Sequence, residues 1–247
     1  MPVQKIMIVG GTSAIAEQVA RRLAATGTAI HLTGRDSARL AVIAADLRAR
    51  GAAQVSCERL DVADPAALDG ALARASAALG GLDAILVAAG LLPDQIALAS
   101  DPARLRLTLE VNAVSAMVLL EQAAALFGRQ GQGQIVAIGS VAGDRGRAVN
   151  YAYGAAKGAL EIFLSGLRQR LRPHGVSVLL VKPGFVDTPM TAGFTKGALW
   201  ASPERVAQDI VTALERRKQV IYTPWFWRFV MLVIRYIPEP IFARLKF

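Results

Sequence analysis

The stretch VGGTSAIA, residues 9–16, follows the apolar run KIMIV and precedes a segment with helical periodicity. A glycine-rich turn between a strand and a helix is typical of a loop that binds dinucleotide phosphates, because the first amides of the helix face the ligand. Gly10 lies at the first glycine position, whereas Ala14 and Ala16 stand where such loops usually carry glycine. The stretch predicts either a dinucleotide site or a fold element that has lost one.

Runs rich in Val, Ile and Leu alternate with helix-period segments along most of the 247 residues. Parallel strands need crossover connections, so this order predicts an α/β fold: a Rossmann-like, doubly wound parallel sheet of about seven strands in three layers, α/β/α. The predicted strands are Lys5–Val9, Ala29–Thr33, Val55–Leu60, Ala84–Ala88, Gln134–Gly139, Ser177–Lys182 and Gln219–Tyr222. The predicted helices are Ala14–Thr26, Ala38–Arg50, Pro65–Leu79, Pro102–Gly128, Tyr151–Arg172 and Pro203–Arg217.

The composition limits the partners and the compartment. Lys and Arg number 28 against 19 acidic residues, a net charge of +9 that suits a phosphorylated ligand or an anionic membrane surface. No dense Lys/Arg block with interleaved aromatic residues is present, so nucleic acid is the weakest candidate partner, and no metal site is predicted. The single cysteine, Cys57, fits a reducing cytoplasm. We expect neither a secretory signal nor an apolar run of the ~20 residues that cross a bilayer.

Four polar side chains are predicted to meet at one strand end. Tyr153 and Lys157 are four residues apart, which places them on one face of a helix, one turn from each other. A Tyr-x-x-x-Lys pair alone is common on protein surfaces. Here Ser140 follows the fifth predicted strand and Asn112 lies in the preceding helix. Because ligands of parallel sheets bind outside the carboxyl ends of the strands, the four residues together indicate a catalytic site.

These motifs resemble the short-chain dehydrogenase/reductase family over nearly the whole chain. VGGTSAIA matches the family's Thr-Gly-x-x-x-Gly-Ile-Gly without a gap, VAAG at 87–90 keeps the last two residues of its Asn-Asn-Ala-Gly, and LEVNAVSA, AIGSVAG and YGAAK carry its tetrad. The resemblance implies an enzyme that interconverts alcohols and ketones, with Asn112, Ser140, Tyr153 and Lys157 as catalytic residues. It implies a nicotinamide cofactor bound by Gly10, Thr12, Ser13, Ile15, Arg35, Asp61, Val62, Ala89, Gly90, Tyr153, Lys157, Pro183, Gly184, Val186 and Thr188.

Ketone reduction needs a hydride at carbon and a proton at oxygen. A free tyrosine titrates near ~10, so we expect Lys157 to lower the pKa of Tyr153 by favouring the phenolate. Ser140 is expected to orient the substrate oxygen by a hydrogen bond. The family resemblance adds that Lys157 holds the nicotinamide ribose and that Asn112 positions a water that relays protons to it.

The residues after the second strand predict NADP(H) in preference to NAD(H). Gly34 stands where the family's NAD-selecting acid would lie, and Arg35 follows it directly, suited to the 2′-phosphate of NADP. Asp36 is more simply interpreted as the cap of the next helix. Asp61 and Val62 resemble the pair that flanks the adenine ring.

The chain continues beyond the predicted catalytic domain, residues 1–223, into an apolar, basic extension, residues 224–247. Nine of the ten residues from Trp225 to Ile234 are apolar, and the basic residues Arg228, Arg235, Arg244 and Lys246 are interspersed. A tryptophan-rich apolar segment with basic residues suits a membrane interface, here the cytoplasmic face of the inner membrane. A buried contact in a homodimer or homotetramer fits the segment almost equally well.

The substrate is the least determined feature. Stretches around 140–160, 182–190 and 228–245 are similar to a reductase of lipid-linked keto-sugars within the family. That similarity implies a polyprenyl-phosphate substrate, a phosphate paired with Arg145 and Arg147, and a partner oxidase that supplies the keto group. Two alternatives stay open: a reductase of another apolar carbonyl compound, such as an acyl, steroid or quinone-like substrate, and a non-catalytic dinucleotide-binding subunit. The intact tetrad argues against the second.

Overall fold

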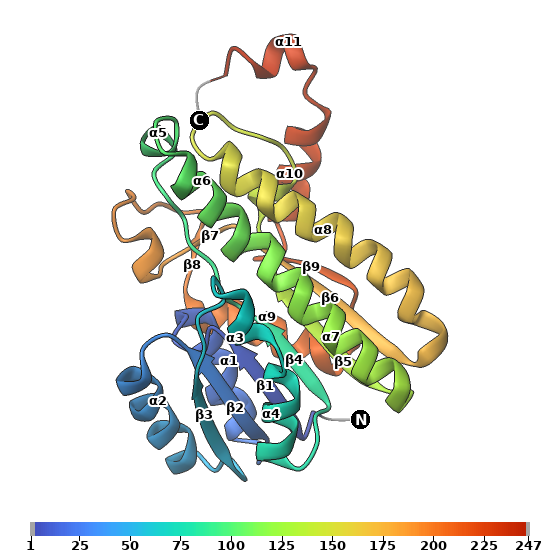
Figure 1. The fold of residues 1–247 in the computed structure, drawn as a ribbon. Helices are drawn as coiled ribbons and strands as arrows, with labels where there is room; N and C mark the ends of the chain where they lie inside the picture. The colour runs from blue at the N-terminus through green and yellow to red at the C-terminus, as the bar shows by residue number, and fades with distance from the viewer. Residues whose placement is uncertain (1–2, 246–247) are drawn as a thin grey trace.

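The computed structural model describes residues 3–245, and its centre is a seven-stranded parallel sheet with helices on both faces (Figure 1). The strand order is β3-β2-β1-β4-β5-β6-β9, and every neighbouring pair is parallel. The strands are β1 (Lys5–Val9), β2 (Ala29–Gly34), β3 (Val55–Arg59), β4 (Ala84–Val87), β5 (Gly133–Ile138), β6 (Val176–Pro183) and β9 (Val220–Thr223). The predicted doubly wound α/β/α sheet is confirmed, with each strand end within one residue of its expected place.

Two separate layers of core side chains hold the helices to the sheet. Successive residues of a strand point to opposite faces, so Met7 and Val9 belong to one core cluster while Ile6 and Ile8 belong to the other. The first cluster packs against α4 (Ala71–Leu79), α7 (Ser115–Gln130) and α8 (Tyr151–Leu171). The second packs against α1 (Ala14–Ala24), α2 (Ser37–Ala49) and α9 (Pro203–Glu215).

Two predicted helices depart from a single regular α-helix: one is broken and the other changes pitch. The segment expected as one helix over Pro65–Leu79 forms α3 (Pro65–Leu68) and α4, because Gly70 lies between them with a left-handed φ of 67°. The helix expected over Pro102–Gly128 is continuous but changes pitch: α6 (Pro102–Leu109) passes into a π-helical turn, η1 (Glu110–Val114), and then into α7. Turns of this kind often mark functional positions, and this one contains Asn112.

The same helical run also bears on the expectation that no apolar segment is long enough to cross a bilayer. Among the described residues, Pro102–Gln130 is long and apolar enough to span a bilayer by length and composition. More than half of its most apolar window is buried inside the protein, where it covers the sheet. Core helices of this kind meet the same criterion, so it carries little weight as a sign of a membrane span.

The strand order reverses between β1 and β4, which are adjacent in the sheet. The loops that follow such a pair of strands leave a crevice between them, here beside Gly10. Gly10 has a φ of 81°, and a Cβ on it would lie 2.6 Å from the backbone N of Ala89 at the end of β4. Only glycine suits this close approach of two loops. Of the three glycines of the motif, the chain keeps only Gly10, and the predicted crevice depends on it.

The extension after β9 forms two further helices at one end of the molecule, α10 (Trp227–Tyr236) and α11 (Glu239–Phe242) (Figure 1). Trp227 and Met231, one turn apart, are buried against Val141. The other side of α10 exposes Phe229 and Val233. Lys246, which was counted among the basic residues of the extension, lies outside the described residues.

Elements outside the regular alternation were not expected from the sequence. They are α5 (Gln95–Leu98), the short 3₁₀ turns η2 (Val141–Gly143), η3 (Arg172–His174) and η4 (Pro189–Thr191), and a two-stranded sheet of β7 (Phe185–Val186) and β8 (Trp200–Ala201). Elements this short have too few residues for a periodic pattern. Three of them, η2, β7 and η4, line the functional crevice.

Candidate active site

A cavity of about 390 Å³ opens at the carboxyl ends of the central strands. It is lined by residues from the loops after β1, β2, β3, β4, β5 and β6, as expected for the switch point of such a sheet. The cavity brings together every residue that was predicted to bind the cofactor or to act in catalysis. These are Gly10, Thr12, Ser13, Ile15, Arg35, Asp61, Val62, Ala89, Gly90, Asn112, Ser140, Tyr153, Lys157, Pro183, Gly184, Val186 and Thr188.

The first turns of α8 present Tyr153 and Lys157 to the cavity. Lys157 is buried and Tyr153 is partly buried, and the Lys157 Nζ donates a hydrogen bond to the carbonyl oxygen of Ile138, 2.9 Å away, at the end of β5. The same Nζ lies 5.8 Å from the centroid of the Tyr153 ring. Ser140, two residues beyond Ile138, shares a side-chain hydrogen bond with Tyr153. The serine hydroxyl, the phenol and the ammonium therefore surround one strand end.

The prediction that Lys157 lowers the pKa of Tyr153 is wrong for this structure. Burial raises the pKa of Tyr153, because the phenolate loses its hydration, and the hydrogen bond with Ser140 offsets this only in part. Burial likewise lowers the pKa of Lys157 to about 8. The ammonium is hydrogen-bonded to the Ile138 carbonyl, and Lys157 does not offset the effect of burial on the pKa of Tyr153. Tyr153 is consequently a protonated phenol at neutral pH, the form that can donate a proton.

Asn112 connects the π-helical turn to the loop after β4. It is fully buried, and its Nδ2 donates to the carbonyl oxygens of Leu91 and Thr108, both at 2.9 Å. Its Oδ1 accepts from the Leu91 amide at 3.2 Å. A Cβ on Gly90 would lie 2.9 Å from this Oδ1 and 3.7 Å from the Lys157 Nζ, so Gly90 keeps the space beside both groups open. One lone pair of Oδ1 remains for a water molecule.

The other end of the cavity is basic and has no carboxylate at Gly34. Arg35 lines it as predicted, and Arg39, one turn along α2, lines it too. Asp36 caps α2 by accepting the Arg39 amide at 2.9 Å, which confirms its structural assignment. The Asp61 Oδ1 accepts a hydrogen bond from the Ala63 amide at 3.0 Å, and the Oδ2 takes no part in that bond.

The loop at the start of α1 has room for a pyrophosphate. Ser13 is the N-cap residue of α1, but its side chain accepts no hydrogen bond from the helix. The first amides of α1 therefore face the cavity, where the oxygens of a phosphate would accept their hydrogen bonds. Ala16 is buried in the core behind the loop, whereas Ala14 lines the cavity. The alanine at 16 therefore affects packing alone, and the one at 14 adds a methyl group beside the phosphate position.

The two arginines of the loop between Ser140 and Tyr153 have different places. Arg147 lines the cavity, its Nε is buried and has no hydrogen-bond partner among residues 3–245, and burial lowers the pKa of its guanidinium. Arg145 is not part of the cavity lining. Its guanidinium is bonded to the C-terminal extension, so the expectation that both arginines face the substrate is wrong for Arg145.

Several cavity residues escaped the sequence analysis. Arg39 belongs to a predicted helix, and only its spacing of four residues from Arg35 could have indicated that it lines the same cavity. Asn150, at the end of the loop that holds Arg147, has a buried Oδ1 without a partner among the described residues. Several apolar side chains of the lining come from loops and from elements of two or three residues, which have no periodicity to indicate a buried face; they are Leu91, Leu92, Val141, Phe185 and Met190.

A sequence model of the short chain dehydrogenase family matches residues 4–198, which include the phosphate loop, the tetrad and the loop after β6. The chain belongs to this family. Members of this family are NAD(P)-dependent oxidoreductases, and so is this chain. Related oxidoreductases match it along almost its whole length, including most of the extension.

An uncharacterized oxidoreductase of Mycobacterium tuberculosis is 38% identical over 240 residues, covering 97% of this chain and 96% of the relative. An uncharacterized oxidoreductase of Streptomyces coelicolor is 36% identical over 250 residues, covering 99% and 96%. Among solved structures, a short chain dehydrogenase/reductase family protein has a TM-score of 0.78 at 28% identity, covering 89% of this chain and 94% of the other. A short-chain dehydrogenase from Sphingobium yanoikuyae, solved in complex with NADPH, has a TM-score of 0.84 at 23% identity, covering 98% and 96%.

Proposed function

We propose that this short-chain dehydrogenase is an NADPH-dependent reductase of a polyprenyl-phosphate-linked keto-sugar, of the decaprenylphosphoryl-2-keto-erythro-pentofuranose type. The observation that carries the proposal is Arg147: a buried guanidinium nitrogen without a partner among the described residues, in the lining of the reductase cavity. An unpaired buried donor of a charged group is costly, so a complementary anion in the substrate would stabilise it. A sugar phosphate next to the ketone supplies that anion.

The tetrad supports the chemistry of carbonyl reduction. When bound, the nicotinamide supplies the hydride for the carbonyl carbon. Tyr153, kept protonated by burial, donates its proton to the carbonyl oxygen, and Ser140 orients that oxygen by a hydrogen bond. Lys157 binds the ribose of the cofactor, and together with a water held at the Asn112 Oδ1 it returns a proton to Tyr153. The product is an alcohol.

The basic adenosine end supports NADPH as the cofactor. Arg35 and Arg39 both line the cavity next to Gly34, where an NAD enzyme would have an acid. The structurally similar Sphingobium yanoikuyae enzyme was solved with NADPH, which agrees with this choice.

The cofactor preference can be measured with Arg35→Ala. Losing one charge-assisted contact to the 2′-phosphate should raise the KM for NADPH about 10-fold and leave the KM for NADH unchanged. Arg50→Ala, which removes the same charge at the far end of α2, is the control and should alter neither constant. Equal changes for both cofactors in Arg35→Ala would contradict the 2′-phosphate assignment.

The surface supports a lipid-linked substrate presented at an anionic membrane, here the cytoplasmic face of the inner membrane. The exposed apolar side chains of the extension are interspersed with arginines, as in segments that lie in a membrane interface; they are Trp225, Phe229, Leu232, Val233, Tyr236 and Ile241. The extension would bring the mouth of the cavity to the lipid. A partner oxidase would supply the keto group there.

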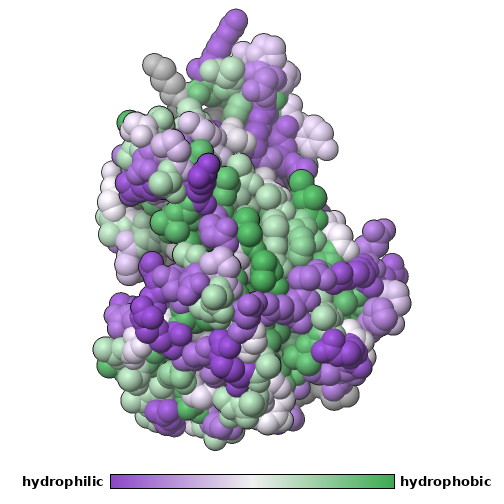
Figure 2. Space-filling model, in the orientation of Figure 1, coloured by the Kyte–Doolittle hydropathy of each residue, from purple (hydrophilic) through white to green (hydrophobic). Residues whose placement is uncertain are grey.

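A second apolar surface supports the proposed homodimer or homotetramer. Figure 2 shows apolar side chains along the middle of the face formed by α6, α7 and α8. Leu105, Leu109, Val114, Val118 and Ile162 are exposed there. An exposed patch of this kind is typical of a subunit contact. Light scattering of the protein in solution would give the mass; a monomer would contradict the assembly.

The substrate is tested by NADPH oxidation with the lipid-linked keto-sugar in anionic liposomes and with apolar acyl, steroid and quinone-like ketones. We expect the phosphate-bearing substrate to have the highest kcat/KM, and the protein to float with the liposomes. The Arg147→Ala variant should raise the KM for this substrate about 10-fold or more, because it loses a buried charge-assisted contact, while uncharged ketones respond less.

The opposite result would favour the alternative function. The apolar lining at the substrate end, including Leu91, Phe185 and Met190, also suits an uncharged carbonyl compound. If uncharged ketones had the higher kcat/KM and Arg147→Ala changed nothing, the enzyme would be a reductase of such a compound. Failure to float with liposomes would remove the membrane surface from the proposal.

A further inference from the structure

The loop between Ser140 and α8 is held by contacts on the side away from the cavity. Val141 and Ala142 line the cavity, but the next two side chains, Asp144 and Arg145, do not. Asp144 contacts the sheet, and Arg145 contacts the extension. These two adjacent residues therefore connect the loop that carries Ser140 to distant parts of the chain.

Arg145 is bonded to the end of α10 and to α11 through both terminal nitrogens of its guanidinium. Its Nη1 donates to the carbonyl oxygens of Ile234 at 2.7 Å and Ile237 at 2.5 Å, and its Nη2 pairs with Glu239 at 2.6 Å. The guanidinium carbon lies 3.6 Å from the centroid of the Phe242 ring. The last carbonyl groups of a helix lack partners within it, so Arg145 acts as the C-terminal cap of α10. The contacts join residues about 90 positions apart.

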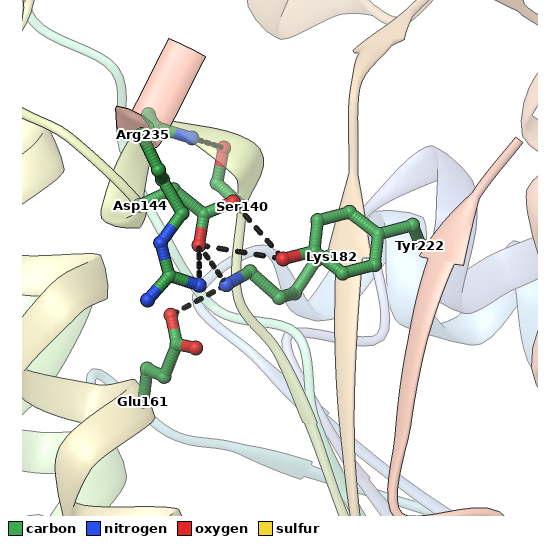
Figure 3. A network of polar contacts seen from close by, with 7 residues as sticks. Ser140, Asp144, Glu161, Lys182, Tyr222 and Arg235 are labelled. Carbon is green, nitrogen blue, oxygen red and sulfur yellow. Dashed lines mark hydrogen bonds and ion pairs between the residues drawn. The ribbon is translucent and has the colours of Figure 1, made fainter. Parts of the chain in front are cut away.

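Asp144 is fixed from the opposite side (Figure 3). The buried ammonium of Lys182, in β6, pairs with Asp144 and with Glu161 of α8. The Tyr222 hydroxyl donates to the Asp144 Oδ2 at 3.2 Å, and Arg235 of α10 approaches the Oδ1 at 4.0 Å. The carboxylate thus joins the loop to β6, β9 and the extension at one point.

The body of α10 completes two walls of the active site. Trp227 and Met231 form one buried cluster with Val141, the residue after Ser140. A Cβ added to Gly184, in the opposite wall, would overlap the indole of Trp227, and the neighbouring Phe185 ring is edge-on to that indole at 5.4 Å. The extension is therefore packed directly behind both the Ser140 turn and the loop after β6.

We propose that Arg145 is a positioning residue of the reductase, through which the C-terminal extension holds the Ser140 loop in its catalytic geometry. Arg145 touches neither the cavity nor the predicted cofactor residues, so it acts on the reaction only through the loop that it anchors. Small displacements of an orienting group reduce turnover strongly. The inference rests on the proposed carbonyl reduction and not on the identity of the ketone, so the assay uses whichever ketone gives the highest turnover.

The test compares Arg145→Ala and Arg145→Lys with Arg228→Ala. Arg228 is an exposed arginine of the same α10, with no side-chain hydrogen bond or ion pair among residues 3–245. We expect Arg145→Ala to lower kcat about 10-fold to 100-fold and to leave the dissociation constant of NADPH unchanged. Lysine keeps the charge but lacks the planar fork, so Arg145→Lys should recover part of kcat. Arg228→Ala should leave kcat unchanged in an assay without liposomes, because its proposed role is limited to the membrane surface.

Hydrogen exchange gives a readout that needs no substrate. The amides of Gly143, Asp144 and Asn150 are bonded within the loop, to Ser140, Val141 and Arg147. In Arg145→Ala these amides should exchange faster while the amides of the central strands stay protected. The proposal is overturned if loop exchange and kcat match the wild type, or if Arg228→Ala lowers kcat equally. If Arg145→Ala does not fold, Arg145→Lys is decisive, and a wild-type kcat in it overturns the proposal.

If no ketone is turned over, the proposed function fails, but faster loop exchange in Arg145→Ala would still show that Arg145 holds the loop. Normal loop exchange with an active wild-type enzyme would leave the proposed function standing and reject the positioning role. The two failures are therefore distinguishable.

Discussion

Replacing Tyr153 by phenylalanine is expected to reduce kcat for ketone reduction by about 10²–10⁴-fold, the usual contribution of a positioned general acid. The phenol is the proposed proton donor, and burial raises its pKa so that it is protonated at neutral pH. Phenylalanine fills the same space and removes only the hydroxyl. Stopped-flow measurement of NADPH oxidation gives kcat, and fluorescence titration gives the affinity for NADPH, which we expect to remain.

The matched control is Tyr151→Phe. Tyr151 begins the same helix, two residues earlier, but its side chain is exposed and does not line the cavity. Its substitution should leave kcat unchanged. Turnover by Tyr153→Phe within a few-fold of the wild type would show that another group donates the proton, and the proposed role of the tetrad would have to be abandoned.

Replacing Lys182 by methionine is expected to lower the free energy of unfolding by about 3–5 kcal/mol, because it leaves Asp144 buried without its charge partner. Burial by itself would lower the pKa of Lys182, yet the hydrogen bonds to Asp144 and Glu161 raise it, which shows how closely the three groups depend on one another. Thermal unfolding should show a decrease in Tm of about 2–4 °C for each kcal/mol lost.

Lys196→Met provides the comparison. Lys196 also pairs with a carboxylate, Asp187, but both side chains are about half exposed, and such pairs contribute about 0–1 kcal/mol. Adding Asp144→Asn to Lys182→Met should recover part of the lost stability, since the charge without a partner is then removed. A Tm for Lys182→Met as high as that of Lys196→Met would mean that the buried network contributes nothing to stability.

Much of the fold and of the cavity could be predicted because both depend on local patterns. The alternation of apolar runs and helical periods identified the seven strands, and parallel strands place their carboxyl ends at one edge. Residues at or near those ends, such as Gly10, Ser140 and Pro183, therefore had to meet. The four-residue spacing of Tyr153 and Lys157 likewise placed them on one face of α8 without knowledge of the tertiary structure.

The interruption of a predicted helix shows where local patterns become insufficient. Residues 65–79 have a continuous helical period, and the break at Gly70 depends on a left-handed backbone that glycine permits but does not require. The pKa of Tyr153 shows the same limit for the site. Spacing placed the ammonium near the phenol, but burial and the direction of the Lys157 Nζ toward Ile138 determine the sign of the shift.

Arg145 and Arg147 separate most clearly what each level of structure determines. The sequence by itself placed two arginines in one loop between Ser140 and Tyr153, and nothing local distinguished them. The tertiary structure directs Arg147 into the cavity and Arg145 to helix carbonyls that lie about 90 residues further along the chain. An irregular loop has no period from which side-chain directions follow, so partners brought by the folding of distant segments decide them. The sequence determined that an oxidoreductase cavity forms here, and only the packing of the extension determined which way the two arginines of its loop point.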